Sequence, residues 1–456
     1  LKNYNRFREH SMKKILILGT EMVTRPMTDY ILNQNFDLTI ATRNPEEVEN
    51  LIGGQPNGKA ISWIPEDEKF TEELIATHDL TVSLLPGKFQ AEVAKICINH
   101  KKQLVTTTRV SSEMKDLDGE AKKAGIILLH EIGFAPGFDH MTAMRLIDKV
   151  QQEGGIIREM YSLSGALAAP EETNNPFRHK FTASPRETIR MYNHGARFLK
   201  NGTIKEIPAD ELFTNPASAE FPGLGKMEIV PHRDSINSVE SYHLAGIQTM
   251  YRGMFHYPNW CEIMNALKSL GLICTVKRSF EGKTYNEIVA EKMGFYPRNV
   301  KEKVAEKLNL GLHSPALDAL EWLGVFSKER VHLKEGSTFD LTTDLMQKKM
   351  MLPEGSRDMN ILLHSLLVEK AGGQNEVVRS RLLAYGTETG TSIAKIGSLS
   401  AAIAAKLILN RAISETGVVV PVSPSIYQPV LAELESMGIS AVEEWNLPET
   451  ERMELI

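Results

Sequence analysis

The first residues that could do chemistry form the turn Gly19-Thr20-Glu21-Met22-Val23-Thr24, directly after an apolar run at residues 13–19. A glycine turn between a strand and a helix lets backbone N–H groups bind a pyrophosphate. Only the first of the three glycines of the GxGxxG pattern is present. A carboxylate at Glu21, about 4 Å from a phosphate, would be repelled by roughly 4 kcal/mol at an effective dielectric constant of about 20. The turn predicts a dinucleotide site that Glu21 weakens, unless its carboxylate points to solvent and stabilises the helix N-terminus.

Arg43 follows a second apolar run, residues 37–42, at the place where a dinucleotide-binding fold selects its ribose. An acidic side chain there favours NAD, whereas an arginine can pair with the 2′-phosphate of NADP. The residue type therefore predicts NADP. The alternative is a solvated surface arginine that binds no ligand.

A third group has the side-chain types of metal ligands, but no HExxH or other paired spacing supports a metal. It consists of His130, Glu131, Asp139 and His140, and the Gly-Pro loop between them explains the cluster better. We expect no metal. The 3 cysteines are widely spaced and form no CxxC pair, which favours buried thiols over disulfides or zinc.

The elements that must hold the turn alternate between short apolar runs and helical patterns. The runs lie at residues 13–19, 37–42, 60–63, 80–85, 104–107 and 126–130, and the helical patterns at 22–33, 44–52, 67–77, 88–99 and 112–123. Strands that alternate with helices in this way predict a parallel sheet covered on both faces. The fold class expected is α/β, beginning with a Rossmann-type dinucleotide-binding domain.

The pattern changes after Glu131, where glycine and proline cluster before a helix at residues 142–152. Extended runs at 157–165, 226–231, 249–256 and 377–386 predict a second α/β domain. Helical periodicity dominates between residues 259 and 350, and an alanine-rich helix follows at 398–410. We expect domains at 12–131, at 132–258 with 351–397, and at 259–350, with a helix at about 398–411 packing back on the first.

Composition limits the class of protein. The chain has 456 residues and a formal net charge of −6, with 42% hydrophobic and 24% charged residues, which is typical of a globular protein of two or three domains. It has no basic stripe, so nucleic acid is not expected as a partner. Without an apolar signal segment or an unbroken apolar run of membrane-spanning length, we expect a cytoplasmic protein and no membrane partner.

Several segments occur in an order that resembles saccharopine dehydrogenase, L-glutamate-forming, also called saccharopine reductase. They are SLLP at 83–86, EIGFAPGFDHMTAM at 131–144, APEETNNPFRHKFTASPR at 169–186, FPG at 221–223, HRDS at 232–235, YRGMFHYPNW at 251–260, EWLG at 321–324 and RDM at 357–359. The resemblance covers nearly the whole chain, from residue 12 to about 439. Such dispersed, ordered agreement is more specific than a lone glycine motif.

The resemblance implies an NADP-binding Rossmann domain, an α/β domain for substrate binding and dimerisation, and a helical insertion. It also implies a homodimer with an amino-acid substrate and with the cofactor between domains. The family reaction reduces the imine of glutamate and 2-aminoadipate 6-semialdehyde with hydride from NADPH, giving saccharopine, and the reverse direction oxidises saccharopine.

The site residues expected on this basis fall into two sets. The cofactor set is Gly19, Thr20, Met22, Val23, Arg43, Ser83, Leu84, Leu85 and Thr107. The substrate set is Asn175, Lys180, Phe181, Arg186, Arg233 and Arg252. Saccharopine has three carboxylates, and guanidinium groups bind carboxylates bidentately, so the arginines are candidate receptors. Each could instead be a structural residue.

The departures from the family lie mainly at the cofactor and reaction pocket. This chain has Ala135, Arg109 and Ser164 where the family usually has aspartate, tyrosine and cysteine, and His256 where it has arginine. Aspartate and tyrosine could assist imine proton transfer, and alanine removes that capacity. The catalytic residues therefore stay unassigned. Three hypotheses remain: a working NADP-dependent saccharopine reductase, an oxidoreductase acting on another amino-acid imine, and a non-catalytic member that binds a ligand or partner.

Overall fold

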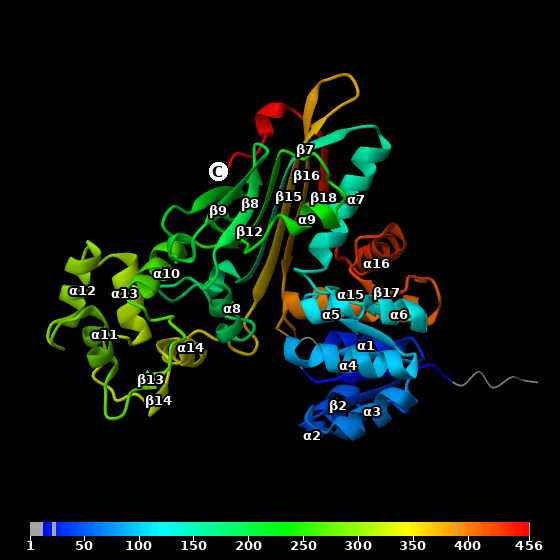
Figure 1. The fold of residues 1–456 in the computed structure, drawn as a ribbon, viewed down its shortest axis with the longest axis horizontal. Helices are drawn as coiled ribbons and strands as arrows, with labels where there is room; N and C mark the ends of the chain where they lie inside the picture. Colours follow the sequence, from blue (N-terminus) through cyan, green and yellow to red (C-terminus); the bar gives the residue numbers. More distant parts are fainter. Residues whose placement is uncertain (1–11, 21–23, 389, 456) are drawn as a thin grey trace, which may run out of the picture. The chain divides into compact units, whose positions relative to one another are not determined.

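The computed structural model describes residues 12–20, 24–388 and 390–455, which form two compact units (Figure 1). The first unit contains residues 12–145 and 393–440. The second contains residues 146–392 and 441–455. Each has its own sheet and is described by itself.

The first unit is built on a parallel seven-stranded sheet, which confirms the predicted Rossmann-type α/β fold. Its strands are β1 (Lys14–Leu18), β2 (Asp37–Thr42), β3 (Gly58–Ser62), β4 (Leu80–Ser83), β5 (Gln103–Thr106), β6 (Ile127–Leu129) and β17 (Gly417–Val419). Their order is β3-β2-β1-β4-β5-β6-β17. The chain therefore reverses its direction of winding between β1 and β4, where ligands of such sheets bind. The last strand was not predicted, because three residues carry no recognisable period.

Helices cover both faces of this sheet. They are α1 (Thr24–Asn33), α2 (Pro45–Ile52), α3 (Glu68–Thr77), α4 (Gly87–His100), α5 (Ser112–Asp116), α6 (Asp118–Ala124), α15 (Ser392–Leu409) and α16 (Pro424–Ser436). Buried residues of α3, α4, α5 and α6 pack with Leu16 and Leu18 of β1. Glu433 of α16 bonds both Tyr30 of α1 and Lys406 of α15, which joins these three helices. The single helix predicted over residues 112–123 is wrong, since the chain turns at Leu117 and forms two.

The second unit contains a nine-stranded mixed sheet. Its main path is β10 (Ala217–Phe221), β11 (Gly225–Pro231), β12 (Thr249–His256), β7 (Ile156–Ala168), β15 (Asp358–Glu369), β16 (Asn375–Tyr385) and β18 (Val442–Leu447), and β8 (Ala196–Lys200) with β9 (Thr203–Ile207) branches from β12. Strands β7 and β12 are parallel, and β15 is antiparallel to β7 and β16. Figure 1 shows β7, β15 and β16 as the long strands of this sheet.

The remaining helices begin with α7 (Phe138–Gln152), which starts in the first unit and ends in the second. Within the second unit lie α8 (Pro185–Met191), α9 (Asn237–Ser241), α10 (Trp260–Ser269), α11 (Tyr285–Met293), α12 (Val300–Leu308), α13 (Pro315–Leu323) and α14 (Thr338–Lys349), with a hairpin of β13 (Arg278–Ser279) and β14 (Glu335–Gly336). Helices α10 to α14 share an apolar core with α8.

Strand β15 was missed in the sequence although it is the strand with the most extensive pairing. Nearly every residue of DMNILLHSLLVE is buried, so its two faces do not alternate between apolar and polar. Asn360 and His364 interrupt the apolar run and hide its strand character. The neighbouring strand β7 runs from Ile156 to Ala168, longer than predicted.

Among the described residues, one helix has the length and apolar composition to cross a membrane. This is Ser392–Leu409 of α15, with a mean hydropathy of 1.5. Of this 18-residue segment, 72% is buried inside the protein, as expected for a helix in a protein core. Length and composition therefore do not distinguish a span from a core helix here.

Candidate active site

Gly19 ends β1 at the point where the strand order reverses. Its φ of +90° is a backbone conformation that glycine adopts at low cost. Its N–H donates to the carbonyl of Ala41 at 2.9 Å. A Cβ added here would lie 3.3 Å from Cδ2 of Leu85 and 3.7 Å from the backbone of Leu84. The structure therefore brings together three residues of the predicted cofactor set, and only glycine fits the turn comfortably.

The rest of the phosphate turn is described only in part. Thr20 is exposed, and its Oγ1 lies 3.0 Å from Oγ1 of Thr42 at the end of β2. The predicted cofactor residues Met22 and Val23, and Glu21 with its predicted repulsion, lie outside the described residues.

Arg43 follows β2 and pairs with Glu66 at 3.1 Å. Its side chain is 64% exposed. A 2′-phosphate arriving here would compete with the Glu66 carboxylate for the guanidinium. Because the pair is exposed, its contribution to stability is small, about 0–1 kcal/mol, and the arginine can change partner.

The carboxyl ends of β4 and β5 supply the other predicted cofactor residues. The Ser83 hydroxyl is buried and has no hydrogen-bond partner within the part of the chain that the structure describes. Thr107, just after β5, lies close to Gly133, whose added Cβ would be 3.4 Å from it. An unpartnered buried hydroxyl at the end of the sheet, the tight Gly19 turn and an exchangeable Arg43 fit a bound dinucleotide phosphate.

The loop that carries Ala135 is closed by main-chain bonds and by Glu131. The Gly133 N–H donates to the Pro136 carbonyl at 2.9 Å. One Glu131 oxygen accepts from the Val110 N–H at 3.1 Å and the other lies 3.0 Å from Nε2 of His140. Glu131 thus ties the segment after Arg109 to the first turn of α7. Sequence analysis grouped Glu131 with His140, but it did not predict that these two side chains pair.

Two groups here have shifted pKa values. Burial alone would raise the pKa of Glu131, but the hydrogen bond and charge of His140 outweigh it and hold that pKa below its usual range. Burial lowers the pKa of His130 to about 4. Glu131 is therefore a carboxylate and His130 a neutral imidazole at neutral pH.

In the second unit, Asn175 organises the loop of the predicted substrate residues. Its Nδ2 donates to the His179 carbonyl at 2.8 Å. Lys180 pairs with Glu172 at 2.8 Å, and this hydrogen bond lowers the pKa of Glu172. The Phe181 N–H donates to the Met350 carbonyl at 2.7 Å. Asn175, Lys180 and Phe181 are therefore parts of one ordered loop.

This loop packs on a buried aromatic cluster that was not predicted. His256 stacks on Trp260 with ring centroids 4.7 Å apart, and its Nε2 lies 3.0 Å from the Tyr192 hydroxyl. The His179 ring lies 4.7 Å from Trp260. Burial lowers the pKa of His179 to about 4 and that of His256 well below its ordinary value. Both imidazoles are neutral, so His256 does not replace the positive charge of the family's arginine.

The three predicted arginines occupy different places. Arg186 on α8 pairs with Asp340 of α14 at 2.6 Å. Arg252 on β12 is buried, and its Nη1 donates to Ser238 at 3.2 Å. Arg233 is exposed after β11. Strand register sets Arg252 beside Ser162, two residues from Ser164 on the same sheet face. The structure therefore places Arg252 and Ser164 on one face of the sheet, whereas Arg186 pairs with a carboxylate of the chain itself.

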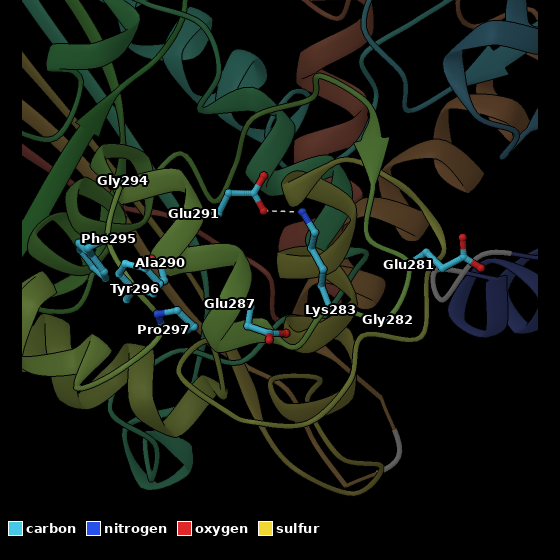
Figure 2. Close-up of a pocket in the computed structure, with 10 residues that line it drawn as sticks. All are labelled: Glu281, Gly282, Lys283, Glu287, Ala290, Glu291, Gly294, Phe295, Tyr296 and Pro297. Atoms are coloured by element: carbon cyan, nitrogen blue, oxygen red, sulfur yellow. Dashed lines mark hydrogen bonds and ion pairs between the residues drawn. The ribbon is translucent and has the colours of Figure 1, made fainter.

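An open cavity of about 550 Å³ lies apart from these residues, around α11 (Figure 2). Lys283 and Glu291 point toward each other across it and form an ion pair, and Phe295 and Tyr296 line another part. None of the predicted site residues lines it. The cavity is therefore separate from the candidate active site.

Comparison with known proteins identifies the family. Residues 15–129 match the saccharopine dehydrogenase NADP binding domain, and residues 133–439 match the saccharopine dehydrogenase C-terminal domain. The chain belongs to the saccharopine dehydrogenase family. Its family resemblance, predicted from ordered segments, is confirmed, and so is NADP as the cofactor of the first domain.

Individual members of the saccharopine dehydrogenase family align over nearly the whole chain. The NADP(+), L-glutamate-forming saccharopine dehydrogenase of Schizosaccharomyces pombe is 32% identical over 454 residues, covering 95% of this chain and 99% of that protein. The mitochondrial alpha-aminoadipic semialdehyde synthase of Bos taurus is 32% identical, and its alignment covers 47% of that longer protein. The structure of apo saccharopine dehydrogenase (L-Glu forming) from Saccharomyces cerevisiae superposes with a TM-score of 0.86 at 28% identity, covering 95% and 99% of the two chains.

Proposed function

We propose that this chain interconverts saccharopine with glutamate and 2-aminoadipate 6-semialdehyde, using NADP, as an enzyme of lysine metabolism. The observation that carries the proposal is the match of both family domains to one continuous chain. Relatives named for this reaction are similar to the chain over 93–95% of its length. The Gly19 turn, Ser83 and Arg43 also fit the phosphates of a bound NADP, the cofactor of this reaction.

The chain's own residues have binding and orienting roles in this reaction. The 2′-phosphate of the dinucleotide would be held by Arg43. The rest of the dinucleotide would be held by the other residues of the cofactor set, which are Gly19, Thr20, Met22, Val23, Ser83, Leu84, Leu85 and Thr107. When bound, NADPH supplies the hydride. Arginine side chains neutralise substrate carboxylates, and Ser164 lies on the same sheet face as Arg252, with a hydroxyl that can hydrogen-bond to the substrate.

Ala135 leaves its position without an acid or base. A protonated imine has an electron-poor carbon that accepts hydride directly, so the reduction needs little further acid–base assistance. In the reverse direction saccharopine would first lose a hydride to bound NADP, and water would then add to the resulting imine carbon so that the carbon–nitrogen bond breaks. We therefore expect a working enzyme whose rate depends on the protonation of its substrate.

A second candidate is an oxidoreductase acting on a different amino-acid imine. Arg109 favours it, because an exposed cation where the family usually has tyrosine changes the charge presented to a substrate. A larger or more acidic amino acid would be the corresponding substrate class.

We assign roles to the segments accordingly. Residues 12–131 with the helix at about 398–411 bind NADP, residues 132–258 with 351–397 bind the amino-acid substrate and form a homodimer, and residues 259–350 are the helical insertion. We also propose a cytoplasmic location, with no membrane or nucleic-acid partner.

The test is saccharopine oxidation by the purified chain, followed by NADPH absorbance and by the release of glutamate. We expect turnover with NADP, slower turnover with NAD, and a loss of that preference in Arg43→Ala. If NADPH binds but saccharopine is not oxidised, this proposal is wrong, and reductive amination with other amino acids tests the second candidate.

Arg186 needs a more careful variant set, because it also pairs with Asp340. We expect Arg186→Ala to raise the KM for saccharopine, whereas Arg190→Ala, on the same helix and near the same Phe339 ring, should not. If Asp340→Asn raises KM as much as Arg186→Ala, the arginine acts by holding α14 and leaves the substrate set.

A further inference from the structure

The loop that contains Asn175, Lys180 and Phe181 turns sharply at Arg178. The Arg178 N–H donates to the Asn175 carbonyl at 2.8 Å, and the Asn175 side chain closes the turn by bonding the His179 carbonyl. Phe177 and His179, on either side, are buried against the aromatic side chains around Trp260. Only the Arg178 side chain of this turn projects into solvent.

Arg178 has a strained backbone. Its φ of +49° lies in the left-handed region, which a residue with a Cβ adopts at a cost in free energy. Most other such positions in this chain are glycine or asparagine, which adopt this conformation more easily. A strained residue in a binding loop is a reason to look for a function of its side chain.

The guanidinium of Arg178 lies 5.2 Å from the centre of the Tyr257 ring. The Tyr257 hydroxyl donates to the Ala168 carbonyl at 3.0 Å, so the ring is fixed at the end of the sheet. Contact with a ring face restricts the guanidinium without using up its in-plane N–H groups. These donors stay available for a planar, bidentate acceptor such as a carboxylate.

Neighbouring cations are already neutralised. Lys180 pairs with Glu172 at 2.8 Å, and Arg357 pairs with Glu171 at 2.9 Å. Across the described ranges of the chain, Arg178 forms no ion pair. Arg178 is therefore the one cation of this group whose guanidinium is not paired with a carboxylate. It lies over the Tyr257 ring, in the loop of the predicted substrate residues.

We propose that Arg178 is a carboxylate-binding residue of the amino-acid substrate and helps select dicarboxylic over monocarboxylic partners. This rests on the proposed function. It adds a receptor to the predicted substrate set, in which Arg186 pairs with Asp340 and Arg252 bonds Ser238. An anionic phosphate of the dinucleotide has related chemistry, and the experiment below separates the two ligands.

Arg178→Gly is the decisive variant, because glycine fits the observed backbone better than arginine and the loop is expected to keep its fold. We expect the KM for saccharopine to rise about tenfold or more, as for a lost charge-assisted hydrogen bond, with kcat changed by less than about twofold. The NADPH Kd should be unchanged and the melting temperature equal or higher. Arg178→Lys keeps the charge without the planar fork, so its KM should lie between those of Arg178→Gly and the unsubstituted chain.

Arg411→Gly is the matched control. Arg411 is also an exposed arginine with positive φ, at +60°, but it follows α15 in the other unit. Its substitution should relieve the same kind of strain without changing KM. An unchanged KM in Arg178→Gly overturns the proposal, and so does a rise in the NADPH Kd that accounts for the loss.

Glutarate binding tests Arg178 independently of saccharopine oxidation. If the unsubstituted chain does not oxidise saccharopine, the proposed function fails, and glutarate binding by calorimetry then tests Arg178 alone. Glutarate binding that weakens about tenfold in Arg178→Gly supports the receptor. Equal binding, or no binding to the unsubstituted chain, overturns it.

Discussion

At the scale of single residues, three buried imidazoles have pKa values well below the ordinary value of histidine. His130 lies at the end of the Rossmann sheet, and His179 and His256 lie in the aromatic cluster that contacts the loop of Asn175, Lys180 and Phe181. All three have pKa values lowered mainly by burial. Each is stable in the folded protein only as a neutral ring, because charging it inside the core would be costly.

This predicts acid destabilisation above the range in which carboxylates titrate. The unfolded chain binds protons at these sites below a pH of about 6.5, whereas folded His130 and His179 bind them only near pH 4. The contribution of neutral His130 and His179 to the free energy of unfolding is therefore fully present above about pH 6.5. It is lost as the pH falls toward about 4. Urea unfolding across this range should give a falling free energy of unfolding, and a flat profile would contradict the prediction.

His179→Phe provides the site-specific check, because phenylalanine keeps the ring contacts and removes the titration. The variant should lose about 3 kcal/mol of the pH dependence between these limits. His313→Asn is the control, since that side chain is 90% exposed and should leave the profile unchanged.

At the scale of elements, α15 packs closely against the loop that carries Ala135. Gly397, within this helix, would place an added Cβ 3.6 Å from the Phe134 nitrogen and 3.8 Å from Cα of Gly133. These are ordinary contact distances for one methyl group. A longer side chain would meet backbone that is held by Glu131 and by the Gly133 turn.

Two substitutions at Gly397 should therefore act in opposite directions. Gly397→Ala should stabilise the protein by about 0.5–1 kcal/mol, because alanine is the better helix former. Gly397→Leu should destabilise it and lower activity by displacing the Ala135 loop. Thermal unfolding with activity assays measures both. Gly119→Leu in α6 is the control, because an added Cβ there meets nothing within 4 Å, and it should lower neither stability nor activity. If Gly119→Leu and Gly397→Leu lower the melting temperature and the activity equally, the packing argument is wrong.

At the scale of the whole molecule, an apolar sheet face continues into solvent in the second unit. Buried Met359 and Ile361 of β15 lie beside exposed Tyr385 and Leu383 of β16, on the same face of the sheet. Exposed Val442 of β18 extends this face by its pairing with Arg381. Exposed apolar side chains that continue a core favour contact with another protein surface.

We therefore expect the proposed homodimer to use this β16–β18 face. Light scattering should give twice the chain mass of 51.0 kDa, and Leu383→Lys should shift the population toward single chains. Leu312→Lys, at an exposed leucine near the start of α13, should leave the mass unchanged. A single-chain mass for the unsubstituted protein contradicts the dimer, and an unaffected Leu383→Lys dimer places the interface elsewhere.

Sequence reasoning reached the elements whose residues have a local period. The alternation of apolar runs and helices over the first 130 residues predicted six of the seven parallel strands, and Gly19 was identified because its turn follows a buried run. It missed β15 and β17, since one is buried on both faces and the other is too short to show a period. Pairings between distant residues, such as Glu131 with His140 across the Gly-Pro loop or Arg186 with Asp340, leave no such local signal.

The sequence by itself determined the family and the cofactor class, because these follow from residue types in short segments that occur in a fixed order along the chain. Only the tertiary structure decided which cations are free to bind a substrate. Arg186 proved to be paired, Arg252 to be buried beside Ser238, and Arg178 to lie uncompensated over Tyr257. The physical reason is that the availability of a charge depends on its neighbours in space, and folding brings those neighbours from remote parts of the chain.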